Sequence, residues 1–192
     1  MENRFRHLLK ISQMEKKDLI KLLDEIFVPL GLKRKGTVGF LMARIKEGDI
    51  FEINTPKGKA YLHYIYKDKT TGDLIRILPG LYSLEPANFD KLAGSKERYM
   101  VYFPLSAANR QNIIQHVGHY PVDNFKKPKY MRTEHIVRGE FLGWHIIDTE
   151  TWQRQLVKTL TPEQKQLSPW GIWNDTLLIE NLVDDWELEK WC

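Results

Sequence analysis

Cysteine is almost absent from this chain. Its 192 residues include a single cysteine, the final residue Cys192. One thiol excludes an intrachain disulfide framework and any zinc site built from several cysteines. A cysteine nucleophile also needs a surrounding pocket that stabilises the thiolate, which a terminal residue rarely has. We therefore expect no catalytic role for Cys192.

Long apolar runs are missing too. None approaches the roughly 20 residues that a membrane-spanning helix needs. The N-terminal stretch MENRFRHLLKISQMEKKD also lacks the continuous apolar segment of a secretory signal. Hydrophobic residues still make up 42% of the chain, which is enough to form a buried core. We therefore expect a globular cytoplasmic protein without a membrane partner.

The sequence contains no motif for nucleotide or metal binding. A Walker loop, a GxGxxG turn, a GxSxG elbow and an HExxH helix are all absent. His116 and His119 would share one face of a helix, but Gly118 and the pair Tyr120-Pro121 argue against a helix there. No acid and base stand out at a defined spacing. We therefore predict a protein that is not an enzyme, with no catalytic residue, no cofactor and no metal.

The positive charge is concentrated at one end of the chain. Residues 1–46 hold eleven of the 29 Lys and Arg residues and five of the 25 Asp and Glu residues, which leaves eighteen basic and twenty acidic residues in the remainder. Surfaces that bind nucleic acids carry their positive charge where the phosphates lie. The nearly balanced remainder therefore argues against a nucleic-acid partner.

Two amphipathic helices bracket the sequence. Near the start, Leu and Ile residues recur every three or four positions over residues 13–28. Near the end, Asn174 precedes an apolar stripe that includes Leu178, Leu182 and Trp186, the pattern of a capped helix. We assign residues 1–46 to an N-terminal extension, made of the first helix and a basic loop, and residues 47–192 to a β-rich domain.

The β-rich domain shows short runs of Ile, Tyr, Phe and Val separated by turn residues such as Pro56-Lys57-Gly58. The second run has apolar residues on both alternating faces, so we expect this strand at the centre of a sheet. The fold class is α+β: a curved antiparallel β-sheet or an SH3-like partial barrel, with an N-terminal helix and a C-terminal helix. The predicted strands are 49–53, 59–66, 73–78, 98–105 and 140–148.

Six short pieces carry a resemblance to a known family. In chain order they are GDIFEI (48–53), GDLIRI (72–77), YFPL (102–105), PKYMR (128–132), GW (143–144) and PWGIWNDTLLIENLVDDW (169–186). With this order and spacing, residues 48–186 resemble the immunity protein 26 family of bacterial polymorphic toxin systems. The resemblance implies a cytoplasmic antitoxin that binds and neutralises a cognate toxin by direct protein–protein contact, as in contact-dependent inhibition. It supplies no catalytic residues.

The sequence leaves two other functions open, which rank second and third. Toxin endoribonucleases with an SH3-like barrel also begin with a Gly-Asp strand and a basic hairpin, so Lys57 and Lys59 would then contact RNA phosphates. That function needs an acid and a base to move the proton of the 2′-hydroxyl, and the sequence does not define such a pair. A structural adaptor is the third possibility.

The end of the chain offers a candidate partner-binding surface. Asp184, Asp185, Glu187 and Glu189 surround Trp191, which we expect to be the most exposed tryptophan of this segment. If the toxin is a nuclease, its active site is basic, and carboxylates around an aromatic anchor complement it. Reversing the charges of Asp185 and Glu187 together with Trp191→Ala would then slow association and weaken binding, with little effect on thermal stability. The alternative is a solvated helix end followed by a frayed terminus.

The missing acid–base and metal patterns give a first testable prediction. The purified protein should neither cleave unstructured RNA nor need a metal ion to fold. Gel analysis of RNA incubated with the protein, and thermal unfolding with and without a chelator, check the two parts. RNA hydrolysis that disappears when Lys57 and Lys59 are both replaced by Ala would instead support the endoribonuclease.

Overall fold

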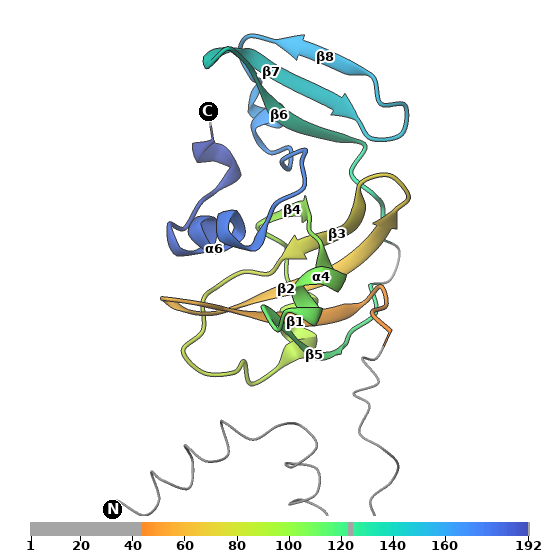
Figure 1. The fold of residues 1–192 in the computed structure, drawn as a ribbon, viewed down its shortest axis with the longest axis vertical. Helices are drawn as coiled ribbons and strands as arrows, with labels where there is room; N and C mark the ends of the chain where they lie inside the picture. The colour runs from red at the N-terminus through yellow and green to blue at the C-terminus, as the bar shows by residue number, and fades with distance from the viewer. Residues whose placement is uncertain (1–43, 123–124, 192) are drawn as a thin grey trace, which may run out of the picture. The chain divides into compact units, whose positions relative to one another are not determined.

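The computed structural model describes residues 44–122 and 125–191. This part of the chain is mixed α+β with two antiparallel sheets and few helices, which confirms the predicted class (Figure 1). The predicted helix over residues 13–28 lies outside the described residues. The elements are β1 (Asp49–Thr55), β2 (Gly58–Asp68), β3 (Gly72–Ile77), α3 (Phe89–Ala93), β4 (Tyr99–Tyr102), α4 (Leu105–Arg110), β5 (Ile114–His119), β6 (Tyr130–Val137), β7 (Glu140–Asp148), β8 (Arg154–Val157), α5 (Pro162–Lys165), α6 (Asp175–Val183) and the 3-10 helix η2 (Leu188–Lys190).

The larger sheet has five strands in the order β4-β3-β2-β1-β5, and all neighbours are antiparallel. Strand β2 lies at its centre and is buried over residues 60–65, as its two apolar faces predicted. The turn between β1 and β2 requires glycine at position 58. The φ angle of Gly58 is +134°, and a Cβ atom there would lie 2.8 Å from the carbonyl oxygen of Tyr82.

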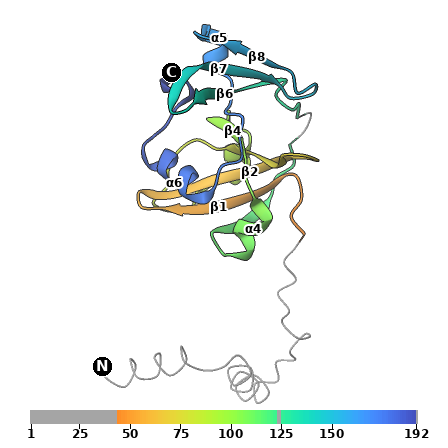
Figure 2. The same cartoon turned by 45° about the horizontal axis from the view of Figure 1, so that its top comes forward.

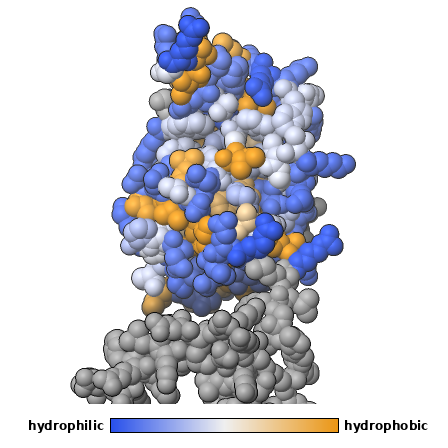
Figure 3. Space-filling model, in the orientation of Figure 1, coloured by the Kyte–Doolittle hydropathy of each residue, from blue (hydrophilic) through white to orange (hydrophobic). Residues whose placement is uncertain are grey.

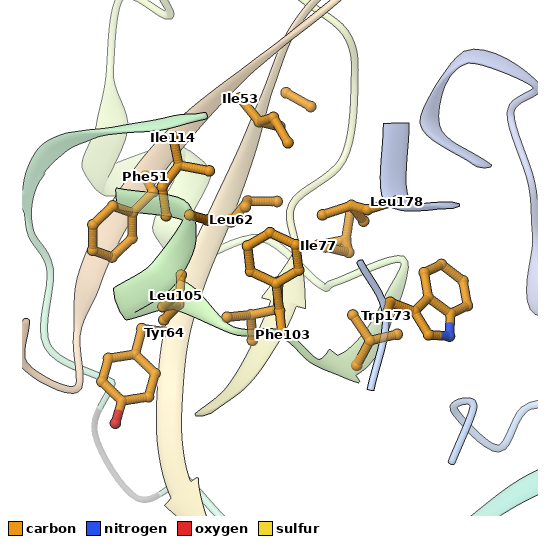
Figure 4. Close-up of a cluster of buried hydrophobic side chains, with 14 of the residues drawn as sticks. Phe51, Ile53, Leu62, Tyr64, Ile77, Phe103, Leu105, Ile114, Trp173 and Leu178 are labelled. Atoms are coloured by element: carbon orange, nitrogen blue, oxygen red, sulfur yellow. The ribbon is translucent and has the colours of Figure 1, made fainter. Parts of the chain in front are cut away.

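One face of the five-stranded sheet packs into the main hydrophobic core (Figure 4). Alternate residues of the strands point to this side because side chains alternate along a strand. Helices α4 and α6 close the core with Leu105 and Leu178, and Trp173 enters from the segment before α6. Each fully buried side chain of this size stabilises the fold by about 1.5–3 kcal/mol. The strand residues include Phe51, Ile53, Leu62, Tyr64, Ile75, Ile77 and Val101.

The opposite face of the sheet is covered as well. Ile50, Tyr61 and Leu78 pack with Leu92 of α3, and the ring of Phe89 contacts that of Tyr61 edge-on with centroids 5.2 Å apart. Further along this face, Ile65, Leu74 and Tyr102 pack against Met131 of β6. Burial on both faces therefore fixes the five-stranded sheet and attaches the beginning of the second sheet to it.

The second sheet has three antiparallel strands in the order β6-β7-β8. We predicted β7 as a strand but did not predict β6, β8 or a separate sheet. Neither sheet closes on itself in the described part of the chain, so the structure shows α+β architecture and leaves the SH3-like barrel as a prediction. Strand β5 is also new. It places His116 and His119 on a strand, in agreement with the argument against a helix there.

Residues 168–173 join the two sheets by pairing with an edge strand of each. In the second sheet, Arg132 of β6 donates its N–H to Ser168 (3.0 Å), and its carbonyl accepts from Trp170 (2.6 Å). In the first sheet, the carbonyl of Tyr102 in β4 accepts from Trp173 (2.9 Å). Figures 1 and 2 show α6 beside the five-stranded sheet and the end of the chain next to the second sheet.

The final helix α6 follows this connection. The side chain of Asn174 accepts a hydrogen bond from the N–H of Leu177 (2.8 Å), so the predicted cap is confirmed. Trp173 and Trp186, at the two ends of the helix, both contact the ring of Tyr99 in β4, with centroids 5.6 and 4.9 Å apart. The two tryptophans therefore anchor α6 on the sheet.

A buried polar pair lies within the five-stranded sheet. His63 of β2 is fully buried; its Nε2 donates to the carbonyl of Tyr120 (2.8 Å), and its Nδ1 accepts from Arg76 of β3 (2.9 Å to Nη2). Burial and the positive charge of Arg76 lower the pKa of His63 to about 4. The imidazole is therefore neutral at physiological pH, with one nitrogen donating and the other accepting.

This pair predicts a pH-dependent loss of stability. The pKa of His63 is lower in the folded than in the unfolded chain, where it is about 6.5. Its contribution is therefore complete above about pH 6.5 and is lost as the pH falls towards the folded pKa of about 4. We expect the free energy of unfolding, measured in urea, to fall by about 1.4 kcal/mol per pH unit through this residue.

The variant His63→Gln keeps one donor and one acceptor but does not titrate. Its unfolding free energy should depend less on pH than that of the wild type between about pH 6.5 and pH 5. Equal pH dependence in the two proteins would contradict this account of His63.

Candidate functional site

The predicted partner-binding residues follow α6 directly. Asp184 ends the helix as its C-cap, and Glu187, Glu189 and Trp191 lie in and around η2. The side chains of Asp184, Asp185, Glu187 and Glu189 are exposed, whereas Trp191 is only partly exposed. The structure therefore brings the four carboxylates to one short stretch of the surface. We call this stretch, residues 184–191, the acidic segment.

The acidic segment begins with a tight turn. Asp185 has a φ angle of +50°, in the left-handed region that glycine, asparagine and aspartate adopt most readily at a helix end. Two backbone hydrogen bonds close the turn: Asp184 donates to Glu180 and Trp186 donates to Asn181, each at 2.9 Å. The chain therefore leaves α6 in a fixed direction, towards the second sheet.

Trp191 does not have the exposed position that we expected. Its ring packs edge-on against Trp144 of β7, with centroids 4.9 Å apart, and it also contacts Trp186 (5.7 Å). Its indole N–H donates to Glu134 of β6 (2.8 Å). The expectation was wrong because β6 and the second sheet, which receive this ring, were not predicted. Trp191 anchors the acidic segment to the protein itself.

Arg132 of β6 contacts the acidic segment on its buried side. Its side chain is fully buried, and its guanidinium lies 4.8 Å from the ring centre of Trp144 and 4.6 Å from that of Trp191. It donates hydrogen bonds to the carbonyls of Lys165 (3.0 Å) and Leu188 (2.5 Å). Cation–π contacts of a desolvated guanidinium contribute about 2 kcal/mol. Arg132 therefore fixes both the backbone of η2 and the ring of Trp191.

A cavity of about 300 Å³ opens beside the acidic segment. It is lined by Arg98, Gln166, Glu187, Leu188 and Glu189. Three of the carboxylates have intramolecular partners: Asp185 pairs with Arg98 (2.7 Å), Glu187 pairs with Lys190 (3.0 Å), and Glu189 accepts from Gln166 (2.6 Å).

These contacts indicate which side chain of a partner protein could bind in the cavity. Surface ion pairs of this kind contribute at most about 1 kcal/mol, so a partner's cation can replace them at little cost. The lining carries two carboxylates and one guanidinium, that of Arg98, so its net charge is negative and favours a Lys or Arg side chain from that partner.

The two lysines of the alternative RNA site both make contacts within the protein. Lys57 donates to the carbonyl of Val183 at the end of α6 (2.6 Å), and Lys59 forms an ion pair with Glu52 (2.9 Å). The basic hairpin therefore supports the position of α6, and a carboxylate neutralises Lys59, whereas Lys57 keeps its positive charge.

The structure also brings together groups that the sequence did not connect. Asp49 of β1, nearly buried, lies 2.9 Å from Nδ1 of His119 and 3.4 Å from Nε2 of His116, both on β5. A partnered carboxylate and imidazole therefore exist, contrary to the sequence analysis. The pairing of β1 with β5 creates the contact, so only a prediction of β5 would have found it. In residues 44–122 and 125–191, no group of three or more His, Cys, Asp or Glu is arranged to hold a metal ion.

Comparisons of the chain with protein-family models, curated proteins and solved structures found no match. The resemblance to the immunity protein 26 family therefore stays a hypothesis from the sequence. Of the helices in the described residues, none has the length and hydrophobicity to span a membrane.

Because Trp191 makes these contacts, we no longer expect its truncation to leave thermal stability unchanged. Trp191→Ala should lower the free energy of unfolding by about 2–4 kcal/mol, because it removes the ring that packs on Arg132, Trp144 and Trp186. Chemical denaturation measures this loss.

Trp152→Ala provides a control. Trp152 is 40% exposed and its ring contacts that of Trp170 (5.1 Å), without a cation–π contact to a buried guanidinium, so its truncation should lower the free energy of unfolding clearly less. An equal or smaller loss for Trp191→Ala would show that the acidic segment is not anchored as described.

Proposed function

We propose that this protein is an immunity protein that binds and neutralises a cognate bacterial toxin by direct protein–protein contact. The observation that carries the proposal is the acidic segment with its cavity: Glu187 and Glu189 line a concave site on a backbone that Arg132 and Trp191 hold in place. The ordered resemblance of residues 48–186 to the immunity protein 26 family supports the same function.

The rigidity of the acidic segment matters for binding. A surface that is already ordered loses less conformational entropy when a partner binds, and more of the interaction energy then appears as affinity. Carboxylates on such a surface also accelerate encounter with a basic partner. A toxin that acts on nucleic acid needs a basic active site to receive phosphate, so it matches this surface in charge. The proposed partner is therefore a toxin with a basic face, such as a nuclease.

The face of the protein viewed in Figure 3 agrees with a contact guided by charge. On the face viewed in Figure 3, hydrophobic residues form separate patches surrounded by hydrophilic ones. Interfaces of this type gain specificity from placed charges around a few anchors. The ion pair of Lys59 with Glu52 and the nearly balanced charge after residue 46 weaken the alternative, an SH3-like barrel that binds or cleaves RNA.

The test uses the product of the adjacent gene as the candidate toxin. The full chain and that protein, purified separately, should form a stable complex on size-exclusion chromatography, and the chain should suppress the toxin's activity. Failure to form a complex together with unaltered toxin activity would refute the proposed function.

A matched pair of variants tests the acidic segment. Glu187→Gln with Glu189→Gln removes two charges at the cavity and keeps both side chains as hydrogen-bond acceptors. It should weaken toxin binding about tenfold or more at low salt, where charge attraction is least screened. Glu85→Gln with Glu150→Gln removes the same charge from two exposed sites outside the cavity and should change binding little. Equal affinities for the two double variants would remove the acidic segment as the binding site.

A further inference from the structure

A second cavity, of about 420 Å³, lies between β3, α3 and the residues that follow β5. It is open to solvent and has the volume of a small-molecule site. Its lining combines a cation, an imidazole, a carboxylate and a phenol with small apolar groups. These groups belong to Arg76, His119, Asp90, Tyr120, Ala93 and Gly94.

Arg76 brings a poorly compensated positive charge to this cavity. Only 11% of its side chain is exposed, and its hydrogen bonds go to neutral acceptors: Nδ1 of His63 and the carbonyls of Ala93 and Ser95. Its ion pair with Glu97 is long, with 3.8 Å between Nη1 and Oε2. Burial lowers the pKa of Arg76, and Glu97 offsets only part of this effect. An anion in the cavity would stabilise this buried guanidinium.

His119 brings a hydrogen-bonding group of fixed orientation to the same cavity. Its Nδ1 lies 2.9 Å from Oδ1 of Asp49, which holds the ring in place and assigns the Nδ1 proton to that contact. The second oxygen of Asp49 accepts from the N–H of Lys46 (2.7 Å). Nε2 is thus the nitrogen that can serve a ligand, as an acceptor in the neutral ring and as a donor in the protonated ring.

We propose that this cavity binds the phosphate group of a small phosphorylated molecule, with Arg76 supplying the charge and His119 Nε2 a directed hydrogen bond. A phosphate that keeps one proton offers both acceptor oxygens and an O–H donor, so it matches His119 in either protonation state. A carboxylate anion offers acceptors alone. This inference is independent of toxin neutralisation and concerns a different surface.

Two neighbouring residues make the site testable without disturbing the buried Arg76. His116 also contacts Asp49, and its side chain is 43% exposed, as is that of His119, but only His119 lines the cavity. Asp90 is exposed on α3 and places a negative charge on the cavity wall. His116→Ala is therefore a matched control for His119→Ala, and Asp90→Asn should improve the binding of an anion.

The experiment is titration of the full chain with inorganic phosphate and, in a second arm, with adenosine 5′-monophosphate, followed by calorimetry and by the NMR signals of the histidine rings. Phosphate should shift the ring signals of His119. His119→Ala should weaken binding about tenfold or more, the loss of one hydrogen bond to a charged group, while His116→Ala changes it little. Asp90→Asn should tighten binding about two- to fivefold, because it removes a like charge.

Tighter binding of the nucleotide than of phosphate would identify a phosphate monoester as the ligand, and equal binding would identify free phosphate. Partial unfolding of a variant would weaken binding, so it cannot explain the higher affinity expected for Asp90→Asn. Absence of saturable binding by either probe to the wild type would overturn the proposal. So would equal losses in His116→Ala and His119→Ala.

Discussion

The buried guanidinium of Arg132 is the interaction on which the C-terminal half of the structure depends. It lies between Trp144 and Trp191 and donates to the carbonyls of Lys165 and Leu188, so one side chain joins β6 to three later parts of the chain. Hydrogen bonds from a charged donor contribute about 1.5–3 kcal/mol each when they are satisfied. Because the backbone of Arg132 also pairs with residues 168–170, the second sheet, the connection to α6 and the acidic segment form one packed unit.

Much of the first sheet could be predicted from local patterns. Strands β1 to β4 alternate or run apolar between clear turns, and β2 has apolar residues on both faces because it lies at the centre. The capped helix α6 could be predicted equally well, since Asn174 precedes a regular apolar stripe. In these elements the local sequence and the tertiary environment favour the same structure, which is why periodicity is sufficient.

The remainder depends on contacts between residues far apart in the chain. Strand β6 carries Arg132, Glu134 and His135, so its pattern is polar, and it becomes a strand only because β7 and residues 168–170 pair with it. Trp191 is anchored by those same partners, and its position could not be predicted without them. Asp49 and His119 are 70 residues apart and meet because β1 pairs with β5, an arrangement that a single sequence does not reveal.

We propose that the acidic segment is an ordered surface that a basic toxin covers. Hydrogen–deuterium exchange of the full chain, with and without the product of the adjacent gene, tests this proposal. In the free protein, the amides of Trp186 and Trp191, which donate to Asn181 and Leu188, should exchange slowly because their hydrogen bonds are fixed. In the complex, added protection should be greatest over residues 184–191. Fast exchange of these amides in the free chain, or added protection only elsewhere, would contradict the account.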